Sequence, residues 1–125
     1  EVFDALHARR TYATTGARIV LDFSAGGIEM GGTGRASAGR PVAIRAAAVG
    51  TDLVDLVEVL RHIDGRPGFA VIAQLAPLER QFDWAFDDDP GPGAAIYYVR
   101  LRQRGRVRGL VAMAWSSPVW IDAEG

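Results

Sequence analysis

Hydrophobic and polar residues alternate along much of this chain with a period of two residues. Near the start, Ile19, Leu21 and Phe23 occupy one set of alternate positions. A period of two places successive side chains on opposite faces of a β-strand, so the pattern predicts strands buried on one face. The same alternation recurs in three further segments, at residues 42–47, 82–86 and 95–103.

Turn-forming residues separate these segments about every eight to twelve residues. They include Asp64-Gly65, Arg104-Gly105 and the tract from Asp87 to Gly93. Short strands with frequent turns are typical of all-β domains. The sequence therefore predicts an all-β fold, specifically a two-sheet, immunoglobulin-like β-sandwich of about seven strands.

Residues 51–63 fit two kinds of secondary structure. Leu53, Leu56 and Leu60 would share one face of a helix capped by Thr51, whereas residues 56–62 also fit a strand. The neighbouring segments are strands, and Asp64-Gly65 is a hairpin-type turn. We therefore expect a strand over about residues 56–62.

The first residues follow a helical pattern, in which Val2, Phe3 and Leu6 lie on one face of a short helix that ends near Arg10. A helix of two to three turns is marginal alone and must pack on other structure. We expect residues 1–16 to form this helix and a junction with an upstream domain, and residues 17–125 to form the β-sandwich.

Composition narrows the chemistry that the chain can perform. The 125 residues include 15 Asp and Glu and 14 basic residues, all of them Arg, so the net charge is −1. A chain with almost no net charge does not attract a polyanion, so we expect no nucleic-acid partner. There is no Cys and there are only two His, so thiolate nucleophiles and a histidine-rich metal centre are excluded. No apolar run is long enough to span a membrane, and no compartment or oligomeric state is indicated.

The two ends of the chain carry more specific motifs, namely Arg9-Arg10-Thr11-Tyr12-Ala13-Thr14-Thr15-Gly16, Tyr97-Tyr98-Val99-Arg100 and Trp115-Ser116-Ser117-Pro118-Val119-Trp120. Together they resemble the C-terminal region of a bacterial family of unknown function, related to PHP-type (polymerase and histidinol phosphatase) metal-dependent hydrolases and carbaryl-hydrolase-like enzymes. In such proteins a distorted barrel with His and Asp metal ligands precedes a small β-sandwich. The resemblance implies that the divalent metal and the catalytic residues belong to an upstream domain. It implies no catalytic residue, metal site or cofactor in this chain.

The leading hypothesis is a non-catalytic sandwich that packs on this upstream catalytic domain and shapes substrate access. Loops at domain junctions often contact ligands, so the residues near the junction are the candidates for this role. They are Arg10, Tyr12, Thr14, Thr15 and Gly16.

The alternative hypothesis is a stand-alone sandwich that binds carbohydrate or phosphate through Trp84, Tyr98 and a stripe of arginines. The candidate anion-binding residues are Arg100, Arg102, Arg106 and Arg108. A competing interpretation makes the stripe a solvated sheet face whose arginines pair with acidic neighbours. We also expect Trp115 and Trp120 in the core or at the domain junction, and Asp87-Asp88-Asp89 in a solvated acidic loop.

Overall fold

The computed structural model describes residues 12–14, 19–37, 41–91, 93–107 and 110–124, and within these ranges it contains strands and no helix. The all-β prediction is confirmed. The predicted helix over residues 2–10 lies outside the described residues. The strands are β1 (Tyr12–Thr14), β2 (Val20–Ala25), β3 (Ile28–Glu29), β4 (Thr33–Ser37), β5 (Val42–Ile63), β6 (Ala70–Leu75), β7 (Glu79–Asp88), β8 (Gly93–Val107), β9 (Leu110–Ser116) and β10 (Val119–Glu124).

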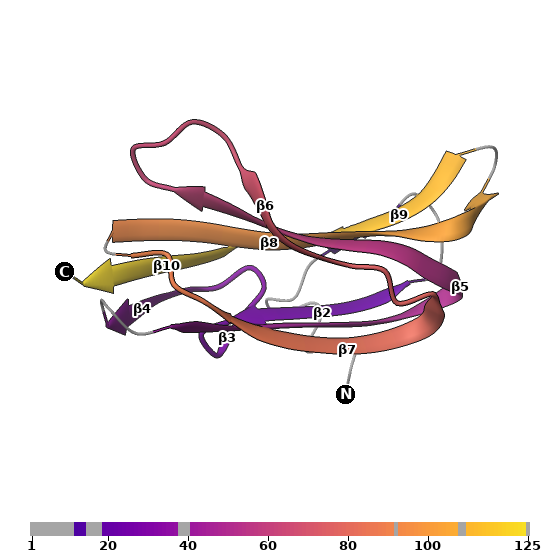
Figure 1. Ribbon diagram of the computed structural model, residues 1–125, viewed down its shortest axis with the longest axis horizontal. Coiled ribbons are helices and arrows are strands. Elements are labelled where there is room, and N and C mark those ends of the chain that lie inside the picture. Colours follow the sequence, from indigo (N-terminus) through magenta and orange to yellow (C-terminus); the bar gives the residue numbers. More distant parts are fainter. Residues whose placement is uncertain (1–11, 15–18, 38–40, 92, 108–109, 125) are drawn as a thin grey trace.

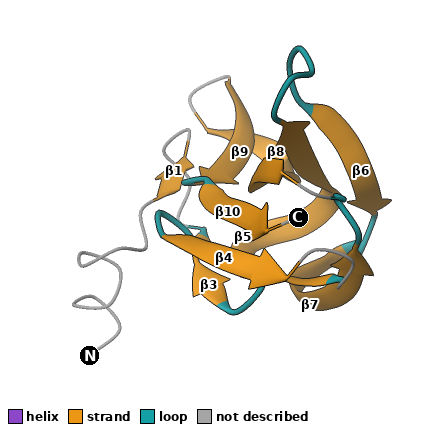
Figure 2. Cartoon of the chain, turned by 90° about the vertical axis from the view of Figure 1, so that its left-hand side faces the viewer, coloured by secondary structure: helices purple, strands orange, loops and turns teal. Residues whose placement is uncertain are grey.

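All ten strands belong to one hydrogen-bonded sheet, with the order β1-β9-β8-β5-β2-β3. β6 and β7 both pair with β5, while β10 pairs with β8 on one side and runs parallel to β4 on the other. The sheet curls until it nearly closes on itself (Figures 1 and 2). This nearly closed, barrel-like sheet differs from the two separate sheets of an immunoglobulin-like sandwich.

β5 connects the two halves of this curled sheet. Its first part, Val42–Val49, lies between β2 and β7, and its second part, Val54–Ile63, lies between β6 and β8. The pairing with β7 and β8 shifts register between these parts, where Gly50 lies against Gln103. A β-carbon added at Gly50 would come within 2.5 Å of the Gln103 side-chain oxygen. The strand predicted over residues 56–62 is confirmed as part of β5.

The hydrophobic core fills the inside of the curl. Residues that alternate along β2, β5 and β8 point inward and are almost fully buried, together with partners from β9 and β10. The largest fully buried side chains are Tyr97, Phe23, Leu21, Met30, Ile44, Leu101 and Ile121.

Candidate functional site

The outer surface of β8 is the first candidate for a functional surface. Along β8, Tyr97, Val99 and Leu101 are buried, so Ile96, Tyr98, Arg100 and Arg102 face outward. Residues directly opposite in an antiparallel pair share a face of the sheet. Three outward residues of the neighbouring strands therefore lie beside this row: Trp120 opposite Ile96, Trp115 opposite Arg100 and Met113 opposite Arg102.

Aromatic side chains gather on this outer surface. Trp115 is 39% exposed and Trp120 is 50% exposed, so neither lies in the core, and the other expected place, the domain junction, stays a prediction. Phe69, which follows the turn after β5, packs edge-on against Tyr98 with ring centroids 5.1 Å apart. We call Phe69, Ile96, Tyr98, Trp115 and Trp120 the aromatic face.

The two described arginines of the predicted stripe lie beside the aromatic face, and each has a carboxylate partner. Arg100 donates a hydrogen bond of 2.9 Å from Nε to Glu58, and Arg102 donates one of 3.0 Å to Asp55. Glu58 also accepts a hydrogen bond from Gln74. Any anion that binds here must compete with these carboxylates, so the anion-binding role stays a prediction.

The other candidates from the sequence are only partly described. Arg106 belongs to β8, but its side chain is outside the described part, as is all of Arg108. Tyr12 and Thr14 lie in β1, which pairs with β9 so that Ala13 is opposite Trp115. Arg10, Thr15 and Gly16 are outside the described residues. The structure thus places β1 next to Trp115 of the aromatic face.

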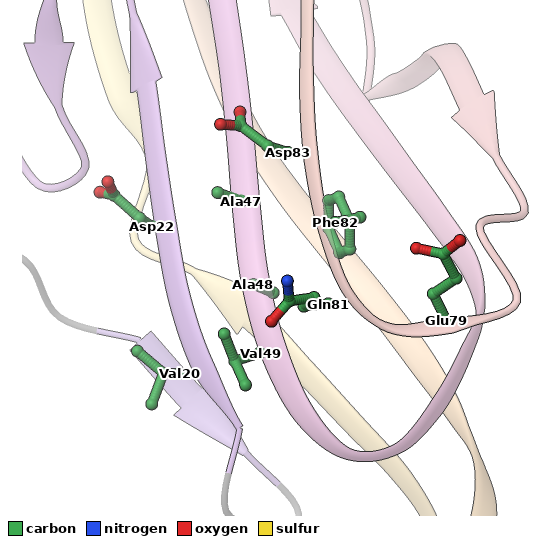
Figure 3. Close-up of a pocket in the computed structure, with 9 residues that line it drawn as sticks. All are labelled: Val20, Asp22, Ala47, Ala48, Val49, Glu79, Gln81, Phe82 and Asp83. Carbon is green, nitrogen blue, oxygen red and sulfur yellow. The ribbon is translucent and has the colours of Figure 1, made fainter.

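The opposite outer surface, on β2, the first part of β5 and β7, holds a hollow of about 460 Å³. Ala47 forms its floor, with Asp22 and Asp83 on either side, and Val20 lies beside Val49 (Figure 3). Glu79 adds a further carboxylate to the lining. The hollow is therefore acidic, with small apolar residues at its base.

One arginine interrupts this acidic surface. Arg45 makes a two-point pair with Asp83, with Nε to Oδ1 at 3.1 Å and Nη2 to Oδ2 at 2.7 Å. The hydrogen bond from Arg45 holds the pKa of the Asp83 carboxyl below its usual value. Both side chains remain mostly exposed, so the pair contributes little to stability.

A buried hydrogen-bond network links β5, β7 and β8. The Tyr97 hydroxyl donates to Asp88 Oδ2 at 2.7 Å, and Arg61 Nη1 donates to both oxygens of the same carboxylate, at 2.8 and 2.7 Å. Burial, and then the hydrogen bond to Asp88, raise the pKa of the Tyr97 phenol above its ordinary value. Tyr97 therefore stays protonated and acts as a structural donor rather than as a base.

The network corrects one expectation from the sequence, because Asp88 is not a solvated loop residue. Its neighbour Asp89 accepts a hydrogen bond from the Gly91 amide, which closes the turn.

The described histidine, His62, has a backbone partner, because its ring nitrogen Nδ1 lies 2.8 Å from the Gly68 carbonyl oxygen. Within the described ranges, no group of three or more His, Asp or Glu side chains could hold a metal ion. Nor does any helix in those ranges have the length and apolarity to cross a membrane.

Trp84, the other aromatic residue of the alternative hypothesis, lies away from Tyr98 in the sheet, and its role in binding stays a prediction. It is half-buried, packs against the core and lies 4.8 Å from Phe86 between ring centroids. Tyr98, by contrast, lies on the outer surface as the alternative hypothesis requires. The sequence signal that separates the two is alternation, because Trp84 shares its face of β7 with Phe82 and Phe86.

Comparisons with known proteins find relatives that are much longer than this chain. An uncharacterized protein of Chlamydia trachomatis serovar D is 32% identical over 138 residues, which cover 97% of this chain and 20% of that protein. An uncharacterized protein of Chlamydia pneumoniae is 35% identical over 136 residues, covering 95% of this chain and 20% of that protein. The chain thus spans about a fifth of the length of the relatives it matches.

No family model matches the chain, and no solved structure matches it. The descriptions of the relatives name no activity. The resemblance to PHP-type hydrolases therefore stays a prediction from the sequence motifs.

Proposed function

We propose that this chain is a non-catalytic β-domain of a longer protein, in which a separate domain performs the chemistry. The observation that carries the proposal is the coverage of the relatives: nearly the whole chain matches, but it accounts for only 20% of each relative. A domain that recurs inside proteins about five times its length has most of the polypeptide outside it.

The chemistry of the described side chains supports a non-catalytic role. Asp88, Glu58 and Asp55 are each engaged by an arginine, and Tyr97 is held protonated. A general base or a nucleophile needs a free, correctly poised group with an orienting partner. These groups instead join strands to one another.

The sequence resemblance adds a proposal for the rest of the longer protein. It would be a PHP-type metal-dependent hydrolase domain, with the divalent metal held by upstream His and Asp residues. The β-domain would then pack on this domain and border its substrate entrance. The motifs at the two ends of this chain are the support for this part of the proposal.

The test compares residues 1–125 with the longer protein from the same gene. Both are assayed for hydrolysis of simple phosphate monoesters and diesters with Mn²⁺ and with Zn²⁺. We expect hydrolysis by the longer protein and none by residues 1–125. Metal-dependent hydrolysis by residues 1–125 would overturn the non-catalytic role, and inactivity of the longer protein would overturn the hydrolase assignment.

A further inference from the structure

Exposed apolar side chains are concentrated on one side of this domain. Phe69 is 46% exposed, Val71 40%, Trp115 39% and Trp120 50%, and all four lie on the β6–β5–β8–β9/β10 side. The residue pairings place Val71 and Tyr98 on the same face of the sheet, because Val71 is opposite the buried Leu60, and Leu60 is opposite Tyr98. Large apolar side chains that share one surface are typical of an interaction site, whereas scattered ones are not.

A hollow adjoins this surface. In Figure 1 the loop that joins β5 to β6 rises above one end of β8, and β9 rises above the other. The hollow has a volume of about 290 Å³ and is lined by Leu56, Met113 and the charged side chains of Glu58, Arg100 and Arg102, of which Arg100 is opposite Trp115. Exposed tryptophans are typical anchors of an interface.

The length of the relatives supplies the occupant. β1 pairs with the edge of β9, and Ala13 is directly opposite Trp115, so this strand borders the aromatic face. Since the relatives are about five times as long as this chain, a large amount of polypeptide is available to cover that surface.

We propose that the aromatic face is an interdomain docking surface, covered by an apolar surface of another domain of the longer protein. This inference rests on the proposed function, because it needs that domain to exist. Interdomain interfaces commonly bury about 600–1,500 Å², within which two tryptophans are sufficient as central anchors. The opposite outer surface suits such a contact poorly, because Asp22, Glu79 and Asp83 surround its exposed valines.

Hydroxyl-radical footprinting with mass spectrometry tests this surface residue by residue. The oxidation rates of Trp115 and Trp120 are compared between residues 1–125 and the longer protein, with Leu78, which is 50% exposed, as a reference. If docking reduces the exposed fraction of each tryptophan from 39% and 50% to about 10%, their oxidation slows about four- to fivefold. We expect Leu78 to react equally in both proteins.

Three results would overturn the proposal. The first is equal oxidation of the tryptophans in both proteins, and the second is equal protection of Leu78. The third is protection of the tryptophans in residues 1–125 that increases with protein concentration, since a second copy would then be the occupant. The proposed function fails separately, through catalysis by residues 1–125, so failure of the docking surface leaves it standing.

A pair of double variants in the longer protein separates docking from general stability. Trp115→Ser with Trp120→Ser should raise the oxidation rate of Phe69 to its value in residues 1–125. Val20→Ser with Val49→Ser is the matched control, because these valines are each 51% exposed on the opposite surface. It should leave the oxidation of Phe69 unchanged, and an equal effect of the two double variants would contradict the proposal. Thermal unfolding of residues 1–125 carrying each pair shows that the domain still folds.

Discussion

Tyr97→Phe is the sharpest test of the buried network. The substitution removes one hydroxyl from a side chain that is fully buried and leaves the Arg61–Asp88 pair in place. A hydrogen bond to a charged group contributes about 1.5–3 kcal/mol to stability. For a domain of 125 residues, about 1 kcal/mol shifts Tm by roughly 4 °C, so we expect Tm to fall by about 6–12 °C.

Tyr98→Phe provides the matched control, because Tyr98 is the next residue on β8 and lies on the outer surface. Its substitution should change the free energy of unfolding by less than about 0.5 kcal/mol. Urea unfolding followed by tryptophan fluorescence measures both variants. If Tyr97→Phe is no more destabilising than Tyr98→Phe, the hydrogen bond to Asp88 contributes nothing and the reasoning is wrong.

The same network predicts a loss of stability at alkaline pH. The folded-state pKa of Tyr97 is raised by burial and by Asp88, while an unfolded tyrosine has a pKa of about 10. The contribution of this phenol is therefore complete below about pH 10 and is lost as the pH rises, because the unfolded state then releases the proton. At pH 11 the loss amounts to about 1.4 kcal/mol, so the stability difference between the wild type and Tyr97→Phe should shrink by that amount from pH 8 to pH 11. A difference that stays constant would contradict the raised pKa.

Three further predictions follow from other contacts. Gly50→Ala should cost about 1 kcal/mol in urea unfolding, because the end of the buried Gln103 side chain must move away from the new β-carbon, and a neutral result would contradict that close approach. Phe23→Ala should cost about 3–5 kcal/mol, since Phe23 is fully buried, and a loss below 1 kcal/mol would contradict its core position. Asp55→Asn with Glu58→Gln should free two guanidinium groups and raise the salt concentration that elutes the chain from heparin, whereas unchanged elution would show that these carboxylates do not compete with anions.

The positions of the strands could be predicted because alternation is a local property of the sequence. Ile19, Leu21 and Phe23 were expected on one face, and all three are at most 3% exposed. The ambiguous segment 51–63 was resolved correctly by its neighbours and by the turn at Asp64-Gly65. In both cases the deciding information lies within about ten residues of the strand itself.

The closure of the sheet could not be predicted, because it depends on pairings between distant residues. The parallel pairing of β4 with β10 joins Gly34 to Ile121, and no local pattern signals it. The continuity of β5 also depends on distant pairings. The part of β5 before Gly50 pairs with β2 and β7, and the part after it pairs with β6 and β8. Two separate predicted strands thus became one strand that turns from one half of the sheet to the other.

The network around Asp88 was missed although part of its signal was present. Ala95, Tyr97, Val99 and Leu101 alternate as one row and are all buried, and a buried tyrosine hydroxyl needs a hydrogen-bond partner. The identity of that partner depends on the ends of two other strands. Sequence alone predicts the need for an acceptor but not which of the three neighbouring aspartates supplies it.

The position of Trp115 links the core to the candidate docking surface. Alternation along β9 places Ala112 and Ala114 inside and Trp115 outside, and both alanines are at most 1% exposed. An aromatic side chain in that position exposes apolar surface to water unless another surface covers it. The same period of two that buries the alanines of β9 therefore places this tryptophan where a neighbouring domain can bind it.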